Sequence, residues 1–168
     1  MTIALQISAI LTRELRSLRR ELEAYENEAD IWRLAPPIAN SAGTLALHLV
    51  GNLRYYVGAR FGGTGYVRDR EAEFRDRGIP LSQLLMRIDT AIREVEDALS
   101  RVTDAQLAAR FPEPVAKLHL NSRDFLIHLA VHAGYHLGQV DYHRRLLTGS
   151  AATVGALLPT ELRSATPA

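Results

Sequence analysis

The sequence contains no cysteine, a single lysine (Lys117) and no run of about 18 apolar residues. The lack of cysteine excludes thiolate nucleophiles, disulfides and cysteine-based metal sites, so any metal ligand must be His, Asp, Glu or water. The lack of a long apolar run predicts no membrane span, and the N-terminus lacks the basic-then-apolar layout of a signal peptide. We therefore expect a cytoplasmic protein.

The sequence also has no excess of charge of either sign. Twenty basic residues balance 19 acidic ones, for a net charge of +1, so the totals give no electrostatic reason to expect a nucleic-acid partner. The chain does have apolar residues, which make up 47% of its 168 residues and are sufficient for the core of one ordinary domain.

Apolar residues recur at steps of three and four in four long segments, which predicts four amphipathic helices. The helices are expected at 2–28, from Asn40-Ser41 to before Gly62, from Pro80 to about 102 and from Asn121 to about 147. The polar segment 62–80 is long for a loop in a helical domain. The predicted fold class is all-α, a four-helix bundle with a long crossover between helices 2 and 3. We expect residues 1–150 to form the bundle and residues 151–168 a C-terminal tail.

Four of the six histidines lie in residues 128–145, HLAVHAGYHLGQVDYHRR. At about 100° per residue they share one helical stripe, which we expect to face the core: His128, His132, His136, His143, Phe125, Gln139 and Leu146. His132 and His136 are four residues apart, so both imidazoles can bind one cation. His48, on the apolar face of the second helix, is a natural third ligand. Hydrogen-bonded core histidines are the alternative interpretation.

Neighbouring polar residues are weighed in the same way. Asn52 lies one turn after His48, and Gln139 lies three residues after His136, so either can orient a ligand or be an ordinary buried amide. His128 is expected beside the site in a non-ligand role. His143 is about 10 Å from His136 along the helix, so a pocket-lining or structural role is expected. No role is assigned to His119.

An apolar patch on the fourth predicted helix and a charged segment before the third have more than one interpretation. Leu126, Ala130, Ala133 and Leu137 lie opposite the histidine stripe, which suggests that the C-terminal tail or a second subunit of a homodimer covers them. The charged residues of segment 68–77 form either a self-paired, solvated loop or a binding site for an anionic substrate at the mouth of a pocket.

Two blocks, SAGTLALHLVGNLRYYVG (41–58) and FLIHLAVHAGYHLGQVDYHRRLLTG (125–149), resemble those of the DinB/YfiT-like superfamily of metal-dependent four-helix proteins. The resemblance implies a divalent metal ion, nickel or zinc, bound by His48, His132 and His136 with open coordination positions. Some similar proteins are S-transferases that use a low-molecular-weight thiol such as bacillithiol or mycothiol. Many relatives have Glu where this chain has Ala133, so hydrolysis by a His-Glu-x-x-His mechanism is not expected.

The sequence therefore predicts a metal-binding protein with an open three-histidine site. The resemblance implies a metal-dependent enzyme, of which a thiol S-transferase acting on a small molecule of unknown identity is one form. Because the chain has no cysteine, a thiol nucleophile must come from a small cofactor. The alternatives are a non-catalytic metal-binding or stress-response module and a helical interaction protein that binds no metal.

Overall fold

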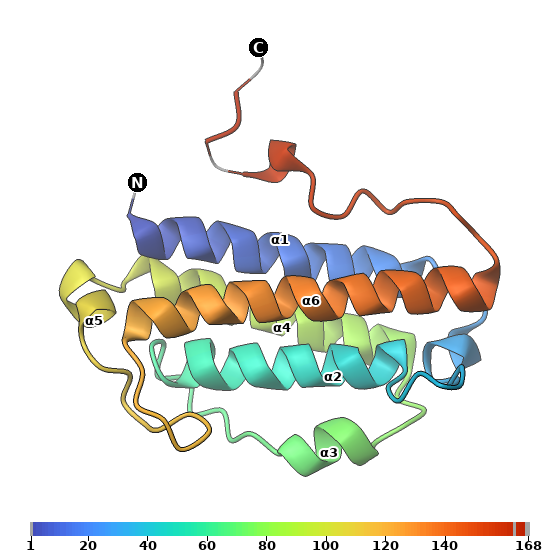
Figure 1. Cartoon of the computed structure of the whole chain (residues 1–168), viewed down its shortest axis with the longest axis horizontal. Coiled ribbons are helices and arrows are strands. Elements are labelled where there is room, and N and C mark those ends of the chain that lie inside the picture. The colour runs from blue at the N-terminus through green and yellow to red at the C-terminus, as the bar shows by residue number, and fades with distance from the viewer. Residues whose placement is uncertain (1, 163, 167–168) are drawn as a thin grey trace.

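A computed structural model describes residues 2–162 and 164–166 as an all-α bundle of four long helices (Figure 1). The long helices are α1 (Ile3–Glu23), α2 (Ala42–Leu53), α4 (Leu81–Ser100) and α6 (Ser122–Thr148). Two short helices, α3 (Arg70–Arg75) and α5 (Asp104–Ala108), lie in the connections. The described residues contain no β-strand, only two isolated bridges. The predicted fold class is confirmed.

The ends of the helices follow from local side-chain chemistry. The Ser41 hydroxyl accepts a hydrogen bond from the Thr44 backbone N–H at the start of α2, and Asn121 caps α6. Gly149 ends α6 in the left-handed conformation (φ 68°). The second predicted helix continues beyond α2 as a π-helical segment, Arg54–Ala59. The first is shorter than predicted, because α1 ends at Glu23 and a 3-10 turn follows at Glu28–Ile31.

The directions of the helices explain the long connection. In Figure 1, α2 and α4 run in the same direction, opposite to α1 and α6. Helices that run in the same direction cannot be joined by a short turn, so the chain returns along the bundle through residues 60–80. The predicted crossover is therefore present, and it contains α3, which packs against α2. This packing brings charged residues of the crossover close to the middle of α2.

Helix α2 lies in the interior of the bundle. It contacts α3, α4 and α6, and all 12 of its residues are buried. His48 is only 7% exposed. A polar ring buried in this way requires partners, since an unpaired polar group away from water is costly.

The predicted orientation of α6 is wrong in part. Ala133 and Leu137, placed on the outer face by the sequence interpretation, are 1% and 2% exposed and face the core. The histidine stripe instead lies along one edge of the buried face: Phe125 and His143 are buried, His132 and His136 are half-buried, and His128, Gln139 and Leu146 are exposed. Because the bundle itself covers the patch, the patch no longer supports a homodimer, which stays a prediction.

The tail is held against the bundle by arginines. Arg20 donates to the carbonyl oxygens of Val154 (3.0 Å) and Gly155 (3.1 Å) and pairs with Glu161 (2.9 Å). In Figure 1 this segment runs alongside α1, away from α2. The tail therefore does not cover the patch of α6 for which the sequence interpretation invoked it.

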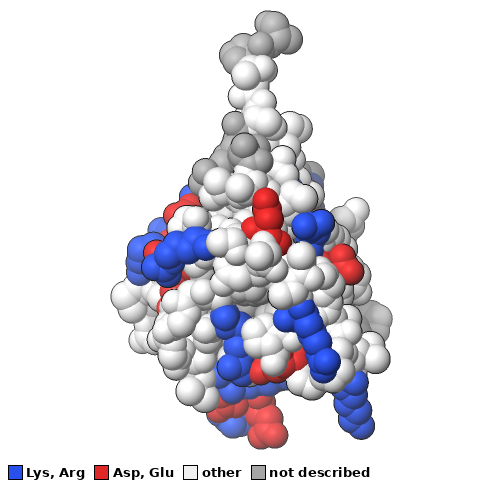
Figure 2. Space-filling view, turned by 90° about the vertical axis from the view of Figure 1, so that its left-hand side faces the viewer, with Lys and Arg blue, Asp and Glu red and all other residues white. Residues whose placement is uncertain are grey.

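The outer surface carries charges of both signs. Figure 2 shows basic and acidic side chains interspersed over the end of the bundle where α1 begins. In the part of the chain that the structure describes, no helix combines the length and apolarity needed to cross a membrane.

Candidate metal centre

The structure brings together the three histidines that the sequence singles out. One ring nitrogen from each of His48, His132 and His136 lies within 4.8 Å of the other two. His132 Nε2 is 3.3 Å from His48 Nε2 and 3.1 Å from His136 Nε2. Helix α2 supplies the first ring, and successive turns of α6 supply the other two.

These spacings match the needs of a metal ion. Two imidazole nitrogens bound to one tetrahedral zinc ion at about 2.0–2.1 Å lie about 3.3–3.4 Å apart. The two Nε2–Nε2 distances in the cluster, 3.3 and 3.1 Å, are close to that value. The residues therefore fit a divalent ion bound through three imidazoles.

His48 is oriented by a carboxylate on the opposite side of its ring. Its Nδ1 is 3.0 Å from Glu73 Oε2 and 3.3 Å from Arg68 Nη2. Since the guanidinium is only a donor, we assign the bond to the carboxylate: His48 Nδ1–H donates to Glu73. This assignment leaves the Nε2 lone pair of His48 directed at the cluster, as a metal ligand requires.

Glu73 is itself fixed in its ionised form. Arg68 donates to both of its oxygens, through Nε at 2.7 Å and Nη2 at 2.8 Å. Burial would raise the pKa of Glu73, but the hydrogen bonds from Arg68 and His48 outweigh it and lower the pKa below its ordinary value. A negative charge is therefore held against the outer nitrogen of His48.

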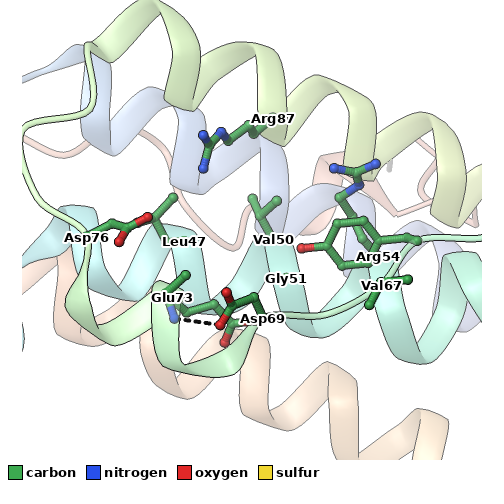
Figure 3. A pocket seen from close by; sticks show the side chains of 11 residues that line it. Leu47, Val50, Gly51, Arg54, Val67, Asp69, Glu73, Asp76 and Arg87 are labelled. Carbon is green, nitrogen blue, oxygen red and sulfur yellow. Dashed lines mark hydrogen bonds between the residues drawn. The ribbon is translucent and has the colours of Figure 1, made fainter.

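Gly51 makes room for this carboxylate. A Cβ atom at position 51 would lie 2.1 Å from Glu73 Oε1, closer than any contact allows. Figure 3 shows Glu73 and Gly51 at the wall of a cavity of about 350 Å³, lined by residues of α2, α3 and α4. A glycine inside a helix costs stability, and its position here is explained by the approach of Glu73.

The sequence interpretation placed Glu73 and Arg68 in a charged segment that was either self-paired and solvated or an anion-binding site, and it missed their role beside His48. The two residues do pair with each other, but the pair is not solvated. Their side chains are only 5% and 10% exposed. A glycine at position 51, one turn after His48 on a buried helix, was the available sequence signal for a close approach.

His136 has a partner on its own helix. Its Nδ1 lies 2.6 Å from Gln139 Oε1, so Nδ1–H donates to the amide oxygen and Nε2 is left free to face the cluster. This is the orienting role that the sequence interpretation considered for Gln139. Burial lowers the pKa of His136, against the opposing effect of the Gln139 bond, so the ring is neutral near pH 7.

His132 lies between the other two rings. Burial, followed by the charges of His136 and His48, lowers its pKa to about 4. A neutral imidazole is the form that binds a metal. Its Nδ1 is buried and has no hydrogen-bond partner among the described residues.

A cavity of about 490 Å³ opens beside the cluster. His48 and His132 form part of its wall, together with Asn52 and His128. Asn52 Oδ1 is buried and unpartnered in the described structure. Two residues that the sequence placed near the site therefore lie next to the cavity, and neither contributes a nitrogen or oxygen to the three-histidine group.

His143 is placed elsewhere. Its Nδ1 accepts from the Tyr25 hydroxyl at 2.6 Å, and its Nε2–H donates to the Arg33 carbonyl at 2.8 Å. It is absent from the residues that line the cavity. Through these two hydrogen bonds, His143 ties α6 to the segment that follows α1, which is a structural role.

The fold and the site together define a helical-bundle protein with a three-histidine cluster able to hold a metal ion. The family model for mycothiol S-transferase matches residues 6–149. The chain therefore belongs to the mycothiol S-transferase family, within the DinB-like superfamily. A search of curated proteins gave no match.

Proposed function

We propose that this protein is a metal-dependent thiol S-transferase. His48, His132 and His136 bind nickel or zinc, and the protein joins a low-molecular-weight thiol, mycothiol by its family, to an electrophilic small molecule. The observation that carries the proposal is the convergence of three imidazole nitrogens, two of them from residues that line a 490 Å³ cavity, in a chain without cysteine.

When bound, a divalent ion lowers the pKa of a coordinated thiol and so favours the nucleophilic thiolate at neutral pH. The protein supplies the arrangement around it. Glu73 and Gln139 accept the Nδ1 protons of His48 and His136, which fixes the tautomers of both rings. The cavity beside His48 and His132 supplies space for the second reactant.

The surroundings favour a thiol over water as the nucleophile. Among the described residues, no Asp or Glu lines the cavity, and Ala133 stands where a His-Glu-x-x-His enzyme has its general base. A metal-bound water attacks faster with help from such a carboxylate base, and none is placed here. A thiol has an ordinary pKa of about 8.5 and needs much less assistance.

The test is a conjugation assay with purified protein that has been stripped of metal and reloaded with zinc or nickel. Mycothiol and 1-chloro-2,4-dinitrobenzene are the reactants, and the thioether product is followed by absorbance. The thiol sulfur bonds to the ring carbon, chloride leaves with the bonding pair, and the thiol proton passes to solvent. We expect turnover only with metal and mycothiol together, and a loss of at least 100-fold in His132→Ala.

His119→Ala is the matched control, because His119 lies outside both the cluster and the cavity lining. It should retain the activity of the unaltered protein. If metal binds to the three histidines but no thiol conjugate forms with a panel of electrophiles, the transferase proposal fails and the non-catalytic metal-binding module replaces it.

A further inference from the structure

The cavity beside the histidine cluster has an uneven charge. Two arginines, Arg68 and Arg70, are among its lining residues, whereas none of the described residues that line it is acidic. The histidines in its wall add no negative charge. A ligand in this cavity therefore faces a positive electrostatic environment.

The two arginines differ in their partners. Arg68 donates two hydrogen bonds to Glu73 and is 10% exposed, so its charge is already compensated. Arg70 is exposed, and its guanidinium makes no hydrogen bond or ion pair among the described residues. It lies over the ring of Phe74, with its carbon 5.0 Å from the ring centroid. Stacking of this kind holds the guanidinium plane while leaving its in-plane N–H donors free.

The wall also has an apolar part, opposite in character to the histidines and Asn52 that line it as well. Phe125 and Leu129 of α6 contribute to it, and Val115 and Ala116 come from the loop before that helix. Val115 and Leu118 pair as an isolated bridge, which forms a tight turn around Ala116 and Lys117. The cavity therefore combines an apolar patch with a cation, Arg70, that has no ion-pair partner among the described residues.

We propose that the electrophilic substrate of this site is an anion, with a carboxylate bound by Arg70 and an apolar or aromatic body packed against Phe125, Leu129 and Val115. This inference rests on the proposed function, because it concerns the second reactant of the same transfer. Arg70 is a substrate-selecting residue, and its planar donors suit a carboxylate through two parallel hydrogen bonds.

Binding tests the inference without turnover. The probes are 4-methylbenzoate and 4-methylbenzamide, which have the same shape and differ in charge, and their affinities are measured by calorimetry with metal-free and zinc-loaded protein. We expect the benzoate to bind about 10–100-fold more tightly than the amide in both forms, the range for a charge-assisted hydrogen-bonded pair. Arg70→Gln should abolish this preference, and Arg70→Lys should restore part of it.

Arg75→Gln is the matched control, because Arg75 lies on the same short helix, pairs with Asp76 and does not line the cavity. It should leave both affinities unchanged. Equal affinity for the two probes would overturn the proposal. So would a benzoate preference that appears only with zinc and persists in Arg70→Gln, because the carboxylate would then be bound by the ion.

A parallel assay separates this inference from the proposed function. It compares 4-(bromomethyl)benzoate with 4-(bromomethyl)benzamide as electrophiles for mycothiol; sulfur bonds to the benzylic carbon, bromide leaves with the bonding pair, and the thiol proton passes to solvent. If neither reacts while the Arg70-dependent binding preference remains, the transferase activity fails and the anion site stands. If both react equally, with no effect of Arg70→Gln, the transferase stands and the anion site fails.

Discussion

Replacing Glu73 by Gln should weaken metal binding and protein stability through two separable effects. Gln has nearly the same shape but no charge, and its amide group turns an N–H donor towards either Arg68 or His48. Both of those neighbours are donors themselves. The substitution therefore removes a hydrogen bond and the charge compensation of Arg68 in one step.

The structure sets the size of each effect. The Arg68 and Glu73 side chains are 10% and 5% exposed. Removing one partner of such a buried ion pair lowers the free energy of unfolding by about 3–5 kcal/mol. Loss of the partner that orients a ligating histidine typically reduces metal affinity by about 10–100-fold. We expect both changes in Glu73→Gln. In the double variant Arg68→Met/Glu73→Gln, stability should largely return because no unpaired charge is left buried. Metal affinity should return in part, since the amide oxygen is then free to accept from His48 Nδ1–H.

Glu94→Gln provides the matched control. Glu94 is also a largely buried carboxylate held by two hydrogen bonds from one arginine, Arg54, at 2.9 and 3.0 Å, but the structure shows no bond from it to a histidine. Urea denaturation of metal-free protein at pH 7 gives the stability, and competition with a chromophoric chelator gives the zinc affinity. Glu94→Gln should lose stability alone. If Glu73→Gln also keeps the zinc affinity of the unaltered protein, Glu73 is only an ion-pair partner and does not support the metal site.

Three further predictions follow from single positions. Gly51→Ala should reduce zinc affinity about tenfold in the same competition assay, because its Cβ would lie 2.1 Å from Glu73 Oε1, whereas Gly134→Ala, with open space around it, should not. Ala116→Gly should raise the free energy of unfolding by about 1 kcal/mol in urea, since Ala116 has a φ of 50°. Burial lowers the pKa of His143, so the unfolded chain binds a proton first and stability falls as pH drops below about 6.5; His143→Asn should reduce this fall in Tm, measured on metal-free protein between pH 8 and 5.

The helices and the three-histidine cluster could be predicted because their signals are local. His132 and His136 are one helical turn apart, and His48 lies in the middle of an apolar helix, so periodicity places the first two rings on one side of α6 and makes His48 a candidate third ligand. The family resemblance then selected these three from six. The structure agrees, with ring nitrogens at 3.1 and 3.3 Å.

The surroundings of the cluster depend on non-local packing and were missed. Glu73 follows His48 by 25 residues, and its position depends on how the crossover returns along α2. The orientation of α6 was misjudged because its apolar residues occupy a wide arc. Phe125 suggested that the histidine stripe was central, whereas Leu129, Ala133 and Val140 lie nearer the middle of the buried face.

The central claim, that His48, His132 and His136 bind one metal ion and leave a position open, is tested most directly by X-ray absorption spectroscopy. Protein reconstituted with one equivalent of zinc is compared with His132→Ala. We predict three imidazole nitrogens at about 2.0–2.1 Å and one further light ligand, with loss of one imidazole in the variant. A spectrum without imidazole scattering, or one that is the same in His132→Ala, would contradict the account.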